Sequence, residues 1–253
     1  MNLLPSLMTL RPFGEAADLD VDFGHADRPS LVTRLLVQCG ECSDPAFWWS
    51  QPVSVRTAAL LRLVAATEQV NAFSFTARCA QAPCGETFEF ELPLPALVAD
   101  ADADADADAT SPIHVALDEQ RSVTLRRPTG DDLRNWQTAR PASRTAAVRM
   151  MLDTLLLAGE VQLQDEARLS DSIAAADPLT AFAVSCQCPA CGAPNEVPID
   201  LDAAALARLR ARQRGLLREI HALASHYGWT ESQVLTIPPA RRAHYLALIE
   251  SQS

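Results

Sequence analysis

The sequence contains no lysine: all 21 of its basic residues are arginine, against 32 acidic residues, and the net charge is −11. A protein that binds nucleic acid over its whole surface must neutralise many phosphates, which this charge disfavours. Long apolar runs are also missing, since the best candidate, MMLDTLLLAG, is too short to cross a bilayer and contains Asp153. The first residues, MNLLPSLMTLRPFG, lack the basic start of a signal peptide and are interrupted by Pro5. These absences predict a cytoplasmic protein with no membrane partner.

Catalytic signatures are absent as well. The sequence has no glycine-rich phosphate loop, no G-x-S-x-G nucleophile elbow and no H-E-x-x-H metal-binding helix. The histidines show no common helical face or ligand spacing. They are His25, His114, His221, His226 and His244. We therefore expect a protein that is not an enzyme and takes no small-molecule substrate.

Cysteine is the residue type that the sequence does supply, in pairs. The stretches CAQAPCG at 79–85 and CPACG at 188–192 each place two thiols around a short turn that ends in glycine. The chain has seven cysteines, an odd number, and no export signal is expected, so a disulfide framework explains them poorly. Metal binding is the leading interpretation for at least four of them.

The two cysteine stretches belong to an internal repeat. A gapless alignment with an offset of 107 residues matches Cys79 with Cys186, Cys84 with Cys191 and Gly85 with Gly192. The flanking segments AFSFTARC, ETFEFELPL and LTAFAVSC alternate apolar and polar residues, as half-buried strands do. We expect the pattern strand, cysteine turn, strand to occur twice.

Two half-sites of this kind make one tetrahedral site for a structural zinc ion, which takes four ligands. The predicted ligands are Cys79, Cys84, Cys188 and Cys191. Cys186 is the alternative, because the gapless repeat matches it with Cys79, whereas the knuckle CPAC favours Cys188. Buried apolar cysteines are the simpler interpretation. A redox CxxC is disfavoured, since no helix is expected to begin at Cys188.

A third CxxC is formed by Cys39 and Cys42, near the end of a predicted helix. No further cysteine pair remains to complete a separate four-ligand site within one chain. We interpret these two residues as core thiols or as part of a helix end.

The periodicity of apolar residues predicts an α+β fold that is mostly helical. Three- and four-residue spacing over 28–70 predicts an N-terminal helical region, 1–70, in which SDPAFWWSQP is expected to be a turn. Region 71–201 contains the cysteine hairpins, which we expect to form a zinc-ribbon-like unit, and inserted helices at 129–176. The tract ADADADADADA is expected to be a solvated loop, 99–110, because aspartates on one strand face repel one another.

The inserted part of this region has local signals of its own. IHVALDEQRSVTLRRP predicts a second hairpin that turns near Asp118. Thr129 is expected to cap a helix whose Asp131 and Asp132 interact favourably with the helix dipole. Another helix, SRTAAVRMMLDTLLLAG, is expected to stop near Gly159, and DEARLSDSIAAAD predicts a weaker one after it.

The C-terminal region, 202–253, is predicted to be a helical module. Leucines at helical spacing continue to a stop at Gly228, and Thr230 begins a capping box for a short second helix. Two prolines end that helix, and ARRAHYLALIE predicts the last one. The module has seven arginines against three glutamates, so its charge is opposite to that of the whole chain. These arginines could contact DNA in a helix-turn-helix, but Trp229 and Tyr245 favour a protein-docking tail with aromatic anchors.

The segment LLREIHALASHYGWTESQVLTIPPARRAHYLALIE resembles the tail of the T-even phage baseplate hub assembly chaperone family, which also occurs in contractile-tail and injection-system gene clusters. In that family a helix precedes a tryptophan-containing turn, an ILxLP-like segment and an arginine-tyrosine pair. The matching residues here are Trp229, Val234, Leu235, Pro238, Arg241, Arg242 and Tyr245. VTLRRPTGDDLRNW is also similar to that family, and the resemblance extends from about residue 30 to 250. The acidic tract and the wider first cysteine turn depart from the family's pattern.

The resemblance implies a non-enzymatic chaperone, or a component, of a contractile-tail or injection-system baseplate hub in the bacterial cytoplasm. Its partners would be hub or spike proteins, contacted through Trp229, Arg241, Arg242 and Tyr245. Whether the protein stays in the finished phage-tail-like particle is left open. The alternative function is a zinc-ribbon regulator that binds DNA through the C-terminal arginines, with Arg208, Arg212, Arg241 and Arg242 as contacts.

Overall fold

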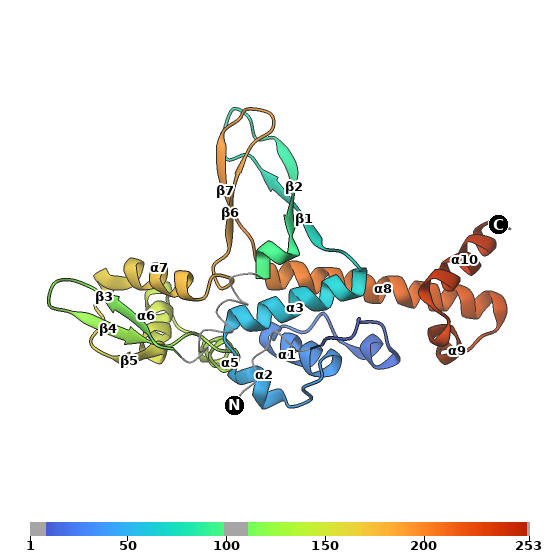
Figure 1. The fold of residues 1–253 in the computed structure, drawn as a ribbon, viewed down its shortest axis with the longest axis horizontal. Coiled ribbons are helices and arrows are strands. Elements are labelled where there is room, and N and C mark those ends of the chain that lie inside the picture. Colours follow the sequence, from blue (N-terminus) through green and yellow to red (C-terminus); the bar gives the residue numbers. More distant parts are fainter. Residues whose placement is uncertain (1–8, 99–110, 252–253) are drawn as a thin grey trace.

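The computed structural model describes residues 9–98 and 111–251 of the chain. A central layer of helices carries three projecting units, namely a pair of β-ribbons, a small lobe with a three-stranded sheet and a helical tail (Figure 1). The predicted α+β class is confirmed. The acidic tract 99–110 lies outside the described residues. Within the two described ranges, no helix combines the length and apolar character that crossing a membrane requires.

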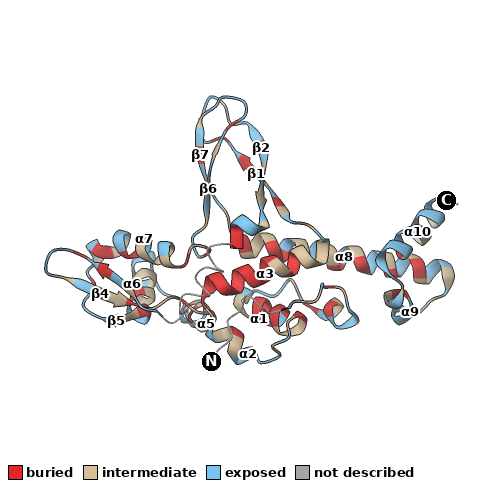
Figure 2. Ribbon diagram, viewed as in Figure 1, coloured by how far each residue is buried: buried red, intermediate tan, exposed pale blue. Residues whose placement is uncertain are grey.

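The central layer consists of α1 (Arg28–Cys39), α3 (Val53–Glu68) and the first half of α8 (Leu201–Tyr227). Helix α3 is buried around most of its circumference because α1 and α8 both pack against it (Figure 2). Leu60 and Leu63 of α3 are fully buried. Because α8 starts in this shared core, the predicted module 202–253 contributes its first turns to the centre of the molecule.

The segment SDPAFWWSQP forms a short helix, α2 (Pro45–Ser50), where a turn was expected. Asp44 accepts a hydrogen bond from the backbone N–H of Ala46 and so caps this helix, which begins with proline at its first position. Trp48 is only 1% exposed and donates its indole N–H to the carbonyl of Cys42. Burial of this large side chain in the core explains why the segment is ordered as a helix.

The lobe has a hydrophobic core of its own, separate from that of the central layer. Its antiparallel sheet has the order β3-β4-β5, and the predicted hairpin that turns near Asp118 is confirmed as β3 and β4. Leu152 and Leu169, from two helices of the lobe, pack on the sheet. The elements are β3 (Ile113–Ala116), β4 (Ser122–Leu125), α5 (Gly130–Ala139), α6 (Arg144–Leu155), β5 (Leu156–Ala158) and α7 (Glu166–Ala176).

The helix that was expected to stop near Gly159 ends at Leu155, so that prediction is wrong for its last turn. Leu156 instead begins β5 and pairs with Leu125 of β4. This pairing satisfies the backbone groups along one edge of β4, which outweighs the helical pattern of the sequence. Gly159 has a φ of +94°, and a Cβ there would lie 2.6 Å from the carbonyl oxygen of Ser122, so glycine is required at the exit.

The expected N-cap of α5 at Thr129 is confirmed, and Asp132 completes a capping box with it. The carboxylate of Asp132 accepts from the backbone N–H of Thr129 and from both terminal nitrogens of Arg126, at 2.5 and 2.7 Å. Burial opposes ionisation of Asp132, but these hydrogen bonds outweigh it and hold the pKa of the carboxyl below its ordinary value. These hydrogen bonds fix the connection between β4 and α5. The connection lies in the segment VTLRRPTGDDLRNW, which is part of the family resemblance.

The tail consists of the second half of α8 with α9 (Glu231–Thr236) and α10 (Pro239–Glu250) packed against it. Gly228 ends α8 with a φ of +70°, and Thr230 and Gln233 form the expected capping box at α9. The tail core is a separate apolar cluster that includes Leu216, Leu223 and Val234, each 0% exposed.

Candidate metal centre

Two antiparallel ribbons rise side by side from the helical layer and converge at their tips (Figure 1). One is formed by β1 (Ala72–Arg78) and β2 (Thr87–Pro93), the other by β6 (Ala183–Gln187) and β7 (Pro194–Pro198). The expected duplication of strand, cysteine turn and strand is thereby observed. Each ribbon has its cysteine turn at the tip. The two turns are about 100 residues apart in sequence but adjacent in space.

The turns have closely related backbone geometry. Gly85 and Gly192, which follow the second cysteine of each turn, have φ values of +56° and +71°. The Gly192 N–H donates to the carbonyl of Cys188, and the Gly85 N–H donates to the carbonyl of Gln81, at 2.8 and 3.0 Å. Glycine adopts this left-handed conformation without the steric cost that other residues meet. Each glycine therefore lets its chain reverse directly after a cysteine.

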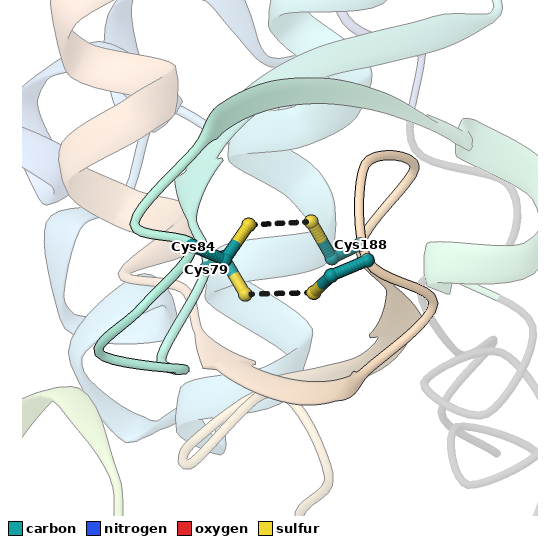
Figure 3. Close-up of side chains that lie close together, drawn as sticks. Cys79, Cys84 and Cys188 are labelled. Carbon is teal, nitrogen blue, oxygen red and sulfur yellow. Dashed lines mark hydrogen bonds between the residues drawn. The ribbon is translucent and has the colours of Figure 1, made fainter.

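Four sulfurs meet where the two turns face each other. Figure 3 shows Cys79 and Cys84 of one turn opposite Cys188 of the other. The Sγ atoms of Cys79 and Cys191 are 3.7 Å apart, those of Cys84 and Cys188 are 3.8 Å apart, and all four lie within 4.8 Å of one another. Thiolates bound about 2.3 Å from one ion at the corners of a tetrahedron lie about 3.8 Å apart. The predicted ligand set is brought together with the spacing that a structural metal ion requires.

The strand register shows which cysteine of the second ribbon corresponds to Cys79. Cys79 donates its N–H to the carbonyl of Glu86, and the equivalent bond of the second ribbon runs from Cys188 to Ala193. Cys79 thus corresponds to Cys188, 109 positions later, whereas Cys84 corresponds to Cys191, 107 positions later. The repeat contains a two-residue difference inside the turn, which a gapless alignment does not reveal.

Cys186, the alternative ligand, lies in β6 and is not part of the four-sulfur group. Side chains two residues apart point to the same face of a strand. Cys186 accordingly packs, half-buried, in the small apolar cluster beneath the sulfurs, together with Ala77 and Phe88. It is placed as an apolar neighbour of the site.

Hydrogen bonds and neighbouring groups shift the pKa values of the Cys84 and Cys188 thiols in opposite directions. Backbone N–H groups of Cys191 and Ala190 donate to the Cys188 sulfur and lower the pKa of that thiol to about 7. At Cys84 the Glu86 N–H favours the thiolate, but burial and the adjacent thiols outweigh it and raise the pKa to about 12. A positive ion among the sulfurs would favour the thiolate at every position, so binding it would release protons.

Asn195 connects the two turns directly. Its side-chain oxygen accepts from the backbone N–H of Ala80 at 2.7 Å, and its amide nitrogen donates to the carbonyl of Ala193 at 2.9 Å. The residue is 5% exposed. Outer hydrogen bonds of this kind orient the ligands of a metal site. Asn195 could not be predicted from the sequence, because an asparagine beside a cysteine turn gives no signal until the partner turn is located.

The predicted partner-binding residues lie in the tail and differ in their surroundings. Trp229 stacks on Tyr227 with ring centroids 4.6 Å apart, and Tyr245 packs edge-on against both rings. Arg241 is exposed. Arg242 is only 4% exposed and donates to Glu219 and to the carbonyl of Ile237. It thus fixes α10 to α8 within the tail.

The arginines predicted to contact DNA in the alternative function are mostly engaged inside the molecule. Arg208 forms an ion pair with Glu68 at 2.6 Å and lies over the ring of Phe73. Arg212 and Arg242 share the carboxylate of Glu219. Of the four residues, Arg241 has a side chain left in solvent.

Cys39 is buried at the last position of α1, where burial raises the pKa of its thiol to about 12, and Cys42 is half-buried in the following loop. This agrees with the interpretation of core thiols at a helix end.

Comparison of the chain with protein-family models, with curated proteins and with solved structures finds no match in any of the three. The family resemblance therefore stays a prediction.

Proposed function

We propose that this protein is a non-enzymatic assembly chaperone, or a component, of a contractile phage tail or injection-system baseplate hub, and that its cysteines bind a structural zinc ion. The observation that supports it most is the convergence of four cysteines from two distant turns on one point. Four protein ligands complete a tetrahedron, and such a closed set is typical of structural rather than catalytic zinc. The site would then serve to fix two ribbons together.

The donor set narrows the choice of metal to two. Four thiolates in a tetrahedral arrangement suit zinc or iron. The deprotonated cysteines would be Cys79, Cys84, Cys188 and Cys191, with Asn195 maintaining the distance between the two turns. Metal analysis of the freshly purified protein tests this assignment, and iron would be recognised by its visible absorption.

The assembly role is supported by the shape of the molecule and by the family resemblance. The ribbon pair, the lobe and the tail point in different directions from one buried helical layer (Figure 2). Such an arrangement offers separate surfaces to several partners, which an assembly factor requires. The aromatic group of Tyr227, Trp229 and Tyr245 is half-buried, so part of each ring is available for a partner.

The alternative role, a zinc-ribbon DNA-binding regulator, draws less support. Its proposed contacts include Arg208, Arg212 and Arg242, whose guanidinium groups already pair with Glu68 or Glu219. These ion pairs would have to break before the arginines could bind DNA. The free energy lost in breaking them would offset part of the free energy gained from binding phosphates.

Co-expression with hub and spike proteins of contractile tails, followed by affinity capture of this chain, tests the proposal. We expect at least one of them to be captured by the wild-type protein. Variant Cys186→Ser, which leaves the four sulfurs in place, should capture it equally well. Absence of every hub and spike protein from the captured material would contradict the proposal.

A further inference from the structure

The two flanks of α8 carry arginines in different states. On one flank Arg208 and Arg212 are paired with Glu68 and Glu219, as described above. On the other flank Arg210, Arg214 and Arg218 follow one another at four-residue steps, which keeps them on one side of a helix. All three are exposed. We call these three residues the arginine row.

The arginine row has no acidic counterpart among the residues that the structure describes. In the described part of the chain no carboxylate lies within 4.0 Å of Arg210, Arg214 or Arg218, although the protein as a whole is strongly acidic. The Nε of Arg218 donates only to the carbonyl of Arg214, one turn earlier in the same helix. A concentration of positive charge of this kind raises the local potential and attracts an oppositely charged surface.

Apolar surface accompanies the charge. Leu217 is 43% exposed and lies on the same flank, between the levels of Arg214 and Arg218. Ala207 and Ala211 on this flank are also exposed, and their small side chains would let another backbone approach closely. Arg214, Leu217 and Arg218 belong to the second half of α8, which extends beyond the central layer (Figure 1). Arg210 lies nearer the layer, beside a hollow that Arg28 and Leu31 of α1 also line.

We infer that the arginine row, with Leu217, is a docking surface for an acidic amphipathic helix of a partner protein. Carboxylates at helical spacing on the partner would meet the three guanidinium groups, and an apolar side chain would cover Leu217. A protein partner fits better than nucleic acid, because a phosphate backbone offers no apolar group to cover the exposed Leu217. The inference names the partner chemistry for the proposed assembly role and rests on that role.

Fluorescence anisotropy with the full-length protein tests this surface. The probes are a labelled helical peptide of glutamate and leucine, the same peptide with glutamine in place of glutamate, and a short DNA duplex. The variants are Arg210→Glu/Arg214→Glu/Arg218→Glu, the charge-conserving Arg210→Lys/Arg214→Lys/Arg218→Lys, and the single change Arg214→Glu. Thermal unfolding and metal content, compared with those of the wild type, check the fold of each variant.

We expect the acidic peptide to bind the wild-type protein more tightly than the glutamine peptide or the duplex does. The charge reversal should weaken binding by about tenfold or more, and the lysine variant by about threefold or less. Arg214→Glu alone should have an intermediate effect, which keeps the test valid if the triple variant does not fold. Equal binding of the acidic peptide to wild type and Arg214→Glu would overturn the inference. Tighter binding of duplex DNA, lost on charge reversal, would overturn it in favour of a nucleic-acid surface.

Capture of hub and spike proteins separates this inference from the proposed function. If the wild-type protein captures none of them yet binds the acidic peptide through the arginine row, the proposed function fails and the docking surface stands. If the charge-reversal variant captures them as well as the wild type does, the docking surface fails and the proposed function stands.

Discussion

The paired ribbons and the helical tail both project from the central helices, but different forces hold them together. Near their tips the ribbons share a small cluster in which four residues are buried, and two of these are the predicted ligands Cys79 and Cys188. The tail has a cluster of leucine, isoleucine and valine side chains, surrounded by three aromatic rings. An isolated two-stranded ribbon is marginally stable in water, whereas an apolar helical core is stable by burial alone. We therefore expect the ribbons to depend on a metal cross-link and the tail to be independent of it.

The largest effect should follow removal of a ligand from the ribbon tip. Cys191→Ser is expected to release the metal and to lower the free energy of unfolding by several kcal/mol, because metal binding and folding of a structural site are coupled. Denaturant unfolding and metal analysis measure the two effects. Cys186→Ser, two residues from Cys188 on the same strand face, is the matched control and should retain the metal. An unchanged metal content in Cys191→Ser would contradict the claim that a metal bound by Cys191 holds the ribbons together.

In the tail the sensitive residue should be a buried leucine. Leu223→Ala is expected to lower the free energy of unfolding by about 3 kcal/mol, because it leaves a cavity beneath α9. Adding a chelator should not increase this loss for the tail, as monitored by tryptophan fluorescence. Leu248→Ala, at a position that is 52% exposed, should change the stability by less than about 0.5 kcal/mol. Equal losses from both changes would mean that the tail lacks the core described here.

Two adjacent arginines of α10 should contribute differently to the stability of the tail. Arg242→Gln should cost about 2 kcal/mol, since the charge of Glu219 would lose one of its two partners near the protein interior. Arg241→Gln should leave the thermal midpoint unchanged because that side chain is exposed. If Arg242 instead serves the partner directly, as the resemblance implies, its replacement would weaken capture without lowering stability.

The smallest effect is expected at Asn195, which supports the ribbon tip without being a ligand. Asn195→Ala removes both hydrogen bonds that its side chain makes to the turns and should cost about 1 kcal/mol. The metal should remain bound, with an affinity reduced about tenfold or more. Competition with a chromophoric chelator measures that affinity. A variant with wild-type affinity would show that the turns are aligned by the sulfurs alone.

Local signals in the sequence were sufficient for much of the fold. Helical spacing located α1, α3 and α8, and the residues that end or cap helices, such as Gly228 and Thr230, act at short range. Tertiary interactions decided the exceptions. Residues 156–158 form a strand that pairs with β4, although their sequence pattern is helical. Trp48 is buried in the core, and this burial orders α2.

The cysteine site could be predicted as a set of residues but not as a geometry. Two matching turns indicated four ligands, yet the choice between Cys186 and Cys188 depends on strand register, which the different turn lengths obscure. Charge pairing along α8 could not be predicted either. Arg208 and Arg210 are two residues apart in sequence, and the packing of α3 against α8 determines which of them meets Glu68.

The most direct test of the account is the metal content and coordination of the freshly purified protein, measured by elemental analysis and X-ray absorption. The account predicts about one zinc ion per chain, surrounded by four sulfur atoms at about 2.3 Å. Less than half an equivalent of metal, or a first coordination shell with fewer than four sulfurs, would contradict it.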